Sequence, residues 1–354
     1  MNHDLALERN ESVAEVELRD RIVGSCILLL ASFPGIALNM LVICLLLRKR
    51  TVAWNSTFPY YGMLMSRCAS DLVILTIYAG YCVPVILFQR SMYGEIGERF
   101  IGWLRQFAYF SGLFHMVLIA VNRYFGVCQL NRYKNVFSVR NTGILISIGW
   151  IFGALVSAVN LLPQCQFKFL YRFNTWGYPL TYKCNVWIIG GDITVNVLAL
   201  ITLVIIYMKV FFQLKMLNKK FIHKTRQIQR RRLSAESQLA IEAVTMTVGL
   251  FAVWVAFIMI PLLTLNRWFL LGNSCLSVIY SSLCACLTYC CKKRLQRLFS
   301  PDGKTFRTNE LQQKFNSPLL NMKKSTQELQ QLLARLWNGM PTCNVSVHGA
   351  PEDS

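Results

Sequence analysis

Seven long apolar stretches dominate the pattern of hydrophobic and polar positions along this chain. They lie at residues 22–47, 58–88, 101–123, 142–162, 186–212, 243–265 and 268–291, with polar or charged segments between them. A helix needs about 20 residues to cross a hydrocarbon core about 30 Å thick, and each stretch is long enough. The pattern therefore predicts an all-α membrane protein, a bundle of seven transmembrane helices.

The composition supports this prediction. Hydrophobic residues make up 54% of the 354 positions and charged residues only 15%, whereas a soluble domain carries about 25% charged residues. The net charge of +20 is interpreted first as basic residues on the cytoplasmic side, attracted to the anionic inner leaflet. We therefore expect the lipid bilayer as a partner, and no nucleic acid.

Lysine and arginine in the short loops predict the orientation, since cytoplasmic loops carry an excess of them. The segments after the first, third, fifth and seventh stretches are basic, while the first 21 residues and the loop after the second stretch are acidic or mixed. The amino terminus is thus expected outside and the carboxy terminus in the cytoplasm. The predicted divisions are an extracellular segment 1–21, a seven-helix transmembrane domain 22–299 and a largely disordered cytoplasmic tail 300–354 with one amphipathic stretch.

Two features of the predicted outer side concern covalent chemistry. Asn10 begins an Asn-Glu-Ser sequon, which is available for glycosylation if this end is outside. Most of the 13 cysteines lie in the apolar stretches, where cysteine behaves as a small apolar residue. Cys165 and Cys184 instead lie at the two ends of the loop between the fourth and fifth stretches, so a disulfide between them can hold these ends together.

Polar side chains inside the apolar stretches are informative, because each is costly in lipid and therefore faces the bundle interior. Asn39 and Asp71 lie at similar depths, so a hydrogen bond between them can tie the first two helices; alternatively, Arg67 neutralises Asp71 from one turn away. Asp192 is the acid of the fifth stretch. It can meet a cationic ligand, pair with Arg105 or face a water-filled mouth.

An arginine triplet, Asn122-Arg123-Tyr124, ends the third stretch on its predicted cytoplasmic side. The chain resembles the rhodopsin-like G-protein-coupled receptor superfamily in this triplet and in further positions over about residues 22–299: Asn39, the Ala-Ser-Asp-Leu at 69–72, Trp150 and the Ile-Ile-Tyr that ends at Tyr207. The resemblance implies that Arg123 moves toward Tyr207 and the G protein on activation. The alternative is that Arg123 only anchors the helix to lipid phosphates.

Four sequence blocks make the resemblance more specific: VPVILFQ at 83–89, HMVLIAVNRYFGV at 115–127, YKNVFSVRNT at 133–142 and CQFKFLYRFNTW with YKC at 165–184. Together they are similar to the nematode serpentine receptor class X family of candidate chemosensory receptors. This resemblance implies a receptor of the plasma membrane or of sensory cilia, with an environmental small molecule as ligand and a heterotrimeric G protein as partner.

Several positions depart from the superfamily pattern. Asn122 replaces the acid that usually precedes the arginine, and only Tyr289 remains of the Asn-Pro-x-x-Tyr of the seventh helix. Asp71 is expected to face Gly112 and Ala285 where Ser and Asn are usual, which argues against a sodium site. Between the sixth and seventh stretches the outer loop is either minimal or part of a helix has been lost. A signalling-deficient or orphan membrane protein, or a transporter, therefore stays open.

Ligand contacts are expected from the outer halves of the third, fifth, sixth and seventh helices, where aromatic residues and a few polar groups can converge. The candidates are Phe107, Tyr109, Phe110, Trp187, Asp192, Asn196, Phe257 and Trp268. For each aromatic residue, packing or an interfacial belt is the alternative. No phosphate loop, metal-spaced His/Cys set or Ser/His/Asp arrangement is present in the sequence, so we predict no enzyme, no cofactor and no metal.

Overall fold

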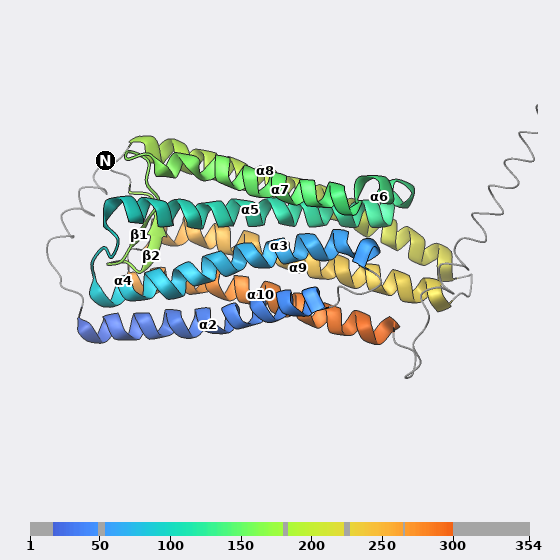
Figure 1. Ribbon diagram of the computed structural model, residues 1–354, viewed down its shortest axis with the longest axis horizontal. Helices are drawn as coiled ribbons and strands as arrows, with labels where there is room; N and C mark the ends of the chain where they lie inside the picture. Colours follow the sequence, from blue (N-terminus) through green and yellow to red (C-terminus); the bar gives the residue numbers. More distant parts are fainter. Residues whose placement is uncertain (1–16, 49–53, 180–182, 223–226, 265, 300–354) are drawn as a thin grey trace, which may run out of the picture. The chain divides into compact units, whose positions relative to one another are not determined.

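A computed structural model describes residues 17–48, 54–179, 183–222, 227–264 and 266–299 of the chain (Figure 1). Its elements are, in chain order, α2 Leu18–Arg48, α3 Trp54–Ile77, the π-helix η1 Tyr78–Cys82, α4 Val83–Phe88, α5 Gly94–Cys128, α6 Leu130–Val136, α7 Val139–Ser157, the 3-10 helix η2 Ala158–Leu161, β1 Lys168–Leu170, β2 Thr175–Gly177, α8 Lys183–Ile222, α9 Gln227–Leu263 and α10 Arg267–Phe299. The sequon at Asn10 and the tail 300–354 lie outside the described residues.

Seven helical segments of the described chain are long and apolar enough to cross a membrane. They are Leu18–Leu47, Pro59–Phe88, Gly94–Cys128, Val139–Leu161, Lys183–Leu217, Ile241–Pro261 and Arg267–Cys290. Each contains most of one predicted apolar stretch, so the seven-helix prediction is confirmed. Several helices extend beyond the apolar residues, because backbone hydrogen bonding continues into water where hydropathy no longer marks the helix.

The helix α5 lies at the centre of the bundle and packs against α3, α7, α8 and α9. Within its most apolar window 67% of the residues are buried, against 17% in α8. A helix surrounded by protein can carry polar groups, and α5 accordingly buries Ser111, His115 and Asn122. The outward faces of α7 and α8 instead expose large apolar side chains such as Leu155 and Phe211, as expected of surfaces that contact lipid.

The close contact between α5 and α7 depends on a glycine. A Cβ atom at Gly153 would lie 2.8 Å from the carbonyl oxygen of Phe107 and would collide with the hydroxyl of Ser111. Small residues let transmembrane helices approach at the backbone, and van der Waals packing then holds them. The start of α7 is set by Ser138, whose side chain accepts a hydrogen bond from the backbone N–H of Asn141 at 3.2 Å.

The second span is interrupted near its end by η1. Pro84, near the start of α4, has no N–H to donate, and its ring cannot sit against the carbonyl of Gly80 in a regular α-helix. The wider π turn accommodates this and buries Tyr78, Tyr81 and Cys82. The span then ends at Gln89, which adopts a left-handed conformation with φ 50°.

An antiparallel hairpin, which the hydropathy pattern did not predict, connects η2 to α8. Its register pairs Lys168 with Gly177, Phe169 with Trp176 and Leu170 with Thr175. The turn places Asn174 at φ 53°, a left-handed conformation that Asn tolerates better than most residues. The hairpin packs on the amino-terminal part of α5, while α6 follows the other end of that helix (Figure 1).

The connection between α9 and α10 covers only residues 264–266. The side chain of Asn266 accepts a hydrogen bond from the backbone N–H of Trp268 at 2.9 Å, which satisfies one of the free donors at the start of α10. Of the two alternatives for this region, the structure has the minimal loop.

Candidate functional site

The hairpin covers a buried cluster around Arg105 of α5, whose side chain is almost fully enclosed. The centre of its guanidinium lies 5.0 Å from the ring centroid of Phe167, 5.2 Å from Trp176, 5.8 Å from Phe257 and 6.0 Å from Tyr78. These rings come from the hairpin segment, α9 and η1, so three separate parts of the chain meet at one cation. Ring faces attract a guanidinium electrostatically.

Polar contacts extend this cluster to α8. The guanidinium of Arg105 donates to Oε1 of Gln106 at 3.4 Å and to the hydroxyl of Tyr78 at 3.5 Å. The amide nitrogen of Gln106 donates to Oδ2 of Asp192 at 3.1 Å and to the hydroxyl of Tyr178 at 2.6 Å. Gln106 therefore connects the buried cation to the buried acid.

Asp192 accepts a second hydrogen bond from the hydroxyl of Tyr178 at 2.6 Å. Burial, followed by the negative charge of Asp192, raises the pKa of Tyr178 well above its usual value, so this phenol stays protonated and continues to donate. Of the roles considered for Asp192, direct pairing with Arg105 is not what the structure has. The carboxylate is held by Tyr178 and Gln106, and its link to Arg105 passes through the amide.

A second pair of side chains joins α5 and α8 close to this cluster. The hydroxyl of Tyr109 donates to the side-chain oxygen of Asn196 at 2.5 Å, and the Asn196 amide donates to the backbone carbonyl of Asp192 at 2.8 Å. The position of the Asp192 segment is therefore fixed relative to α5 by both its side chain and its backbone.

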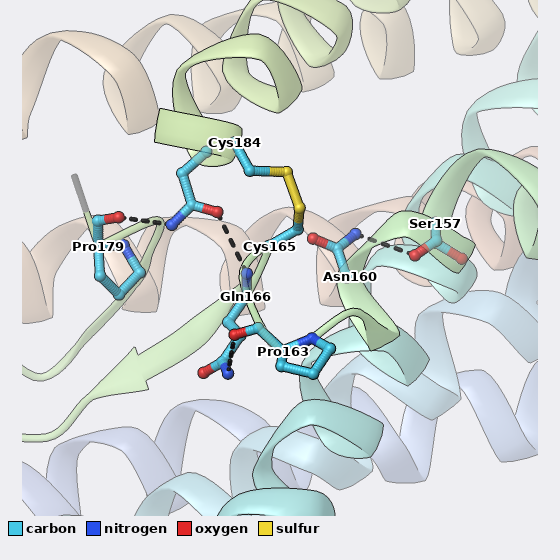
Figure 2. The surroundings of a disulfide bond; sticks show 8 residues. Ser157, Asn160, Pro163, Cys165, Gln166, Pro179 and Cys184 are labelled. Atoms are coloured by element: carbon cyan, nitrogen blue, oxygen red, sulfur yellow. Dashed lines mark hydrogen bonds between the residues drawn. A yellow bond between two sulfur atoms is a disulfide. The ribbon is translucent and has the colours of Figure 1, made fainter. Parts of the chain in front are cut away.

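The hairpin is anchored from several sides. Cys165 and Cys184 form a disulfide, which is the pair that the sequence singled out (Figure 2). Beside it, the backbone N–H of Gln166 donates to Oδ1 of Asn185 at 3.1 Å, and the Gln166 amide donates to the carbonyl of Pro163 at 2.6 Å. At the far end of the hairpin, the hydroxyl of Ser274 in α10 donates to the carbonyl of Asn174 at 2.9 Å.

The hairpin segment also lies directly against α5, because Gly102 has no side chain. A Cβ at this position would collide with the backbone carbonyl oxygen of Phe167. Phe167 stacks on Trp176 with ring centroids 5.3 Å apart and an interplanar angle of 11°. The disulfide, the glycine and the stacked rings together hold the hairpin over Arg105.

The structure brings together some of the predicted ligand contacts and separates others. Tyr109, Asp192, Asn196 and Phe257 lie in or beside the Arg105 cluster, and Phe110 is buried among apolar residues of α5, α9 and α10. Phe107 instead turns toward α7, with its ring 5.2 Å from that of Trp150. Trp187 is 84% exposed, and Trp268 is exposed beside Arg267.

Sequence reasoning missed the contribution of the hairpin, namely Phe167, Trp176 and Tyr178, and it also missed Tyr78 and Gln106. A signal was present in the sequence, since Phe167, Phe169 and Tyr171 alternate with other residues as in a strand. Three-residue strands are too short for such a signal to stand out. The other two residues gave no local signal.

Deeper in the bundle, a second buried network surrounds Asp71. Its Oδ1 lies 2.9 Å from Nη1 of Arg67 and accepts a hydrogen bond from the hydroxyl of Ser281 at 3.0 Å. The Asn39 amide donates to the carbonyl oxygens of Gly35 at 2.9 Å and Ser281 at 3.3 Å. The predicted hydrogen bond between Asn39 and Asp71 is therefore wrong. Ser281 of α10 stands between them, and the alternative of neutralisation by Arg67 is correct.

Gly112 faces the cation of this network. A Cβ at Gly112 would collide with Nη1 of Arg67 and would lie 2.9 Å from the hydroxyl of Ser70. The expectation that Asp71 faces Gly112 is corrected accordingly, because the longer guanidinium of Arg67 reaches that space. The glycine makes room for an internal cation.

At the opposite end of α5 from the hairpin, Arg123 contacts a neutral amide and a ring. Its Nη2 donates to Oδ1 of Asn122 at 2.6 Å, and its guanidinium centre lies 4.2 Å from the ring centroid of Tyr60. The Asn122 amide donates to the hydroxyl of Tyr133 at 3.2 Å, which links the triplet to α6. Tyr124 lies beside this group and accepts a hydrogen bond from the Gln129 side chain.

The two tyrosines expected to act with Arg123 lie on α8 and α10. Tyr207 of α8 is buried with Ala120, Leu203 and Ala243. Tyr289 of α10 packs on the apolar cluster between α2, α3 and α5. Glu242 at the start of the sixth span is also buried.

The sequence profile of the family described as serpentine type 7TM GPCR chemoreceptor Srx matches residues 29–287. Melatonin receptor type 1B-A of Danio rerio is 26% identical over 137 residues, 38% of this chain and 46% of that receptor. Melatonin receptor type 1C of Xenopus laevis is 29% identical over 126 residues, 34% of this chain and 28% of that receptor. The chain thus matches less than half the length of these curated relatives.

Among solved structures, squid rhodopsin is similar with a TM-score of 0.66 at 12% sequence identity, and the superposition covers 82% of this chain and 87% of that one. At this identity the likeness concerns the fold, which is the rhodopsin-like arrangement of seven helices. The profile match covers well over half of the chain and includes both ends of α5. The chain therefore belongs to the serpentine type seven-transmembrane GPCR chemoreceptor family Srx, a family of receptors and not of enzymes.

Proposed function

We propose that this protein is a chemosensory G-protein-coupled receptor of the plasma membrane, including that of sensory cilia. It binds a small environmental molecule near the hairpin and activates a heterotrimeric G protein through the end of the bundle that contains Arg123. Membership of the receptor family supports this function. The transporter alternative is set aside for the same reason.

One observation carries the proposal: a single buried helix, α5, bears both Arg105 and Arg123. The two are separated by about 27 Å along the helix axis, from the rise of about 1.5 Å per residue. Both guanidinium groups contact neutral amides and aromatic faces. A ligand that binds one arrangement of the hairpin end better than another shifts the balance between states of this helix.

The proposed coupling to the G protein can be tested at Arg123. Its contact with Asn122 is a hydrogen bond to a neutral amide, which is weaker than a hydrogen bond between two charged groups. In the proposed active state, the guanidinium turns toward Tyr207 and the G protein. This exchange of acceptors makes the inner end a two-state element.

Ligand-dependent nucleotide exchange tests the function. The chain is expressed with a panel of G proteins and exposed to volatile and soluble chemicals, and surface expression is measured in parallel. We expect Arg123→Ala to abolish exchange while surface expression is retained. Arg140→Ala is the matched control, since Arg140 lies exposed at the start of α7 near the same end of the bundle. If the wild-type chain reaches the cell surface but no chemical produces nucleotide exchange with any G protein, the chain is a signalling-deficient relative.

The proposed orientation places the amino terminus outside and the basic loops in the cytoplasm. Glycosylation of Asn10 requires this orientation, because the transferase acts on the luminal side. We expect glycosidase treatment to increase the gel mobility of the wild type and not that of Asn10→Gln. Antibody binding to an amino-terminal epitope tag on intact cells checks the same point. If the antibody binds only after the cells are permeabilised, the amino terminus is cytoplasmic and the proposed orientation is wrong.

A further inference from the structure

Among the residues that the structure describes, the buried charge of Arg105 has no acidic partner. Only 7% of the residue is exposed, and within the described chain no carboxylate lies at ion-pair distance from it. Its Nε has no hydrogen-bond partner there either. A guanidinium carries five N–H donors, and the two acceptors that it meets, Gln106 and Tyr78, lie at 3.4 and 3.5 Å. These contacts are longer than the usual N–H to oxygen distance of about 2.9 Å.

The acid closest in the hydrogen-bond network is already engaged. Asp192 accepts from Tyr178 and Gln106, and the second N–H of the Gln106 amide is used by the Tyr178 hydroxyl. Gln106 is held in this orientation by both contacts, so only its oxygen faces Arg105. The ring faces around the guanidinium attract it but cannot accept hydrogen bonds as oxygens do. Among the described residues, the Arg105 guanidinium therefore lacks an anionic hydrogen-bond acceptor.

We propose that Arg105 binds the carboxylate of the ligand, and that the ligand class is a small organic acid with an apolar or aromatic body. This inference rests on the proposed receptor function and names its ligand class. A carboxylate matches the planar fork of a guanidinium with two parallel hydrogen bonds, which a neutral group cannot do. Phe167, Trp176 and Phe257 already surround the cation and supply the apolar contact for the rest of the molecule.

An amine ligand fits this site less well. The positive charge of Arg105 repels an ammonium group, and Asp192 has already accepted two hydrogen bonds. A purely structural role, in which Arg105 only supports the hairpin rings, is the competing explanation. The two explanations differ in one respect, since an arginine with a purely structural role binds no acid.

Binding is measured without any G protein, on the full chain in lipid nanodiscs. The probes are acetate, hexanoate, benzoate and phenylacetate, each compared with its primary amide, and palmitate as a membrane-borne acid. The readouts are the thermal unfolding midpoint and tryptophan fluorescence, to which Trp176 contributes. We expect at least one water-soluble acid to bind while its amide binds at least about tenfold more weakly.

The variants then locate the binding site. Arg105→Gln is expected to weaken acid binding at least about tenfold, and Arg105→Lys to retain part of it because the charge is kept. Arg99→Gln is the matched control, since Arg99 lies on the same helix toward the same end and pairs only weakly with Glu95, at 3.9 Å. It should leave acid binding unchanged.

Several results would overturn the inference: equal binding of an acid and its amide, binding of acids to Arg105→Gln as tight as to wild type, or no acid bound by folded wild-type protein. Binding of palmitate alone would assign the site to a membrane lipid and overturn the water-soluble ligand. The acid and amide comparison uses only wild-type protein, so misfolding of a variant does not remove the test. Acid binding without nucleotide exchange would contradict the proposed function alone, and exchange with neutral chemicals alone would contradict this inference alone.

Discussion

Arg67 and Asp71 of α3 form an ion pair at 2.9 Å inside the helix bundle, where the two residues are 5% and 1% exposed. Their charges are out of reach of water and lie between helices α3, α5 and α10. Removing one partner of such a pair leaves an uncompensated charge, which destabilises a protein by about 3 to 5 kcal/mol.

We therefore expect Asp71→Asn to lower the free energy of unfolding by about that amount, measured by thermal or denaturant unfolding in nanodiscs. The chain offers a matched control with the same spacing, because Glu95 and Arg99 form a looser pair at 3.9 Å in which the Glu95 side chain is 65% exposed. Glu95→Gln should change stability by less than about 1 kcal/mol. Similar effects at both positions would show that burial is not what makes the inner pair important.

Glycine at 153 sets the distance between α5 and α7. Gly153→Ala is expected to destabilise the bundle by about 1 to 3 kcal/mol, because the added methyl group meets a backbone carbonyl that cannot rotate away. Gly143→Ala, on the same helix, places its methyl group where no atom lies within 4 Å. It should be neutral or stabilise by about 0.5 to 1 kcal/mol through helix propensity. The unfolding midpoint of Gly153→Ala should therefore fall, whereas that of Gly143→Ala should stay the same or rise.

The Cys165–Cys184 disulfide closes a segment with a sequence separation of 19 that includes the hairpin. Cys184→Ser is expected to cost about 2 to 4 kcal/mol of stability. It should also weaken ligand-dependent nucleotide exchange, because Phe167 and Trp176 are then held over Arg105 less firmly. Cys26→Ser is the control, since Cys26 is a free, exposed cysteine of α2. An unchanged response in Cys184→Ser would mean that Gly102 and Ser274 suffice to hold the hairpin.

Asn122 offers a test of how firmly Arg123 is held. Asn122→Asp replaces a neutral acceptor by a charged one, which strengthens the hydrogen bond to Arg123. The native Asn122 amide donates to Tyr133, so in the variant this hydrogen bond reverses and the Tyr133 hydroxyl donates to the carboxylate. We expect lower basal nucleotide exchange in this variant. Asn131→Asp adds the same charge on the exposed face of α6 near the same end. Equal basal exchange in Asn122→Asp and wild type would refute the idea that the native Asn leaves the resting state less restrained.

The sequence alone determined the class of this protein, because membrane crossing is decided by local composition. Seven stretches of sufficient length and hydropathy were identified without any contact information, and all seven correspond to helices. The sequence blocks around 83–89, 115–127, 133–142 and 165–184 also pointed to the family that the profile match establishes. The candidate pair of cysteines followed from their place at the two ends of one loop.

Tertiary structure decided which polar groups meet. Ser281 and Asp71 are separated by 210 positions, and nothing near either residue indicates that Ser281 stands between Asp71 and Asn39. Arg105 is an unremarkable cation on a helix until residues from the hairpin, η1 and α9 enclose it. Side-chain partners are set by how helices rotate and pack, and periodicity along one segment does not contain that information. Local sequence determined where the helices form, whereas the sites on them arose only from the packing of distant segments.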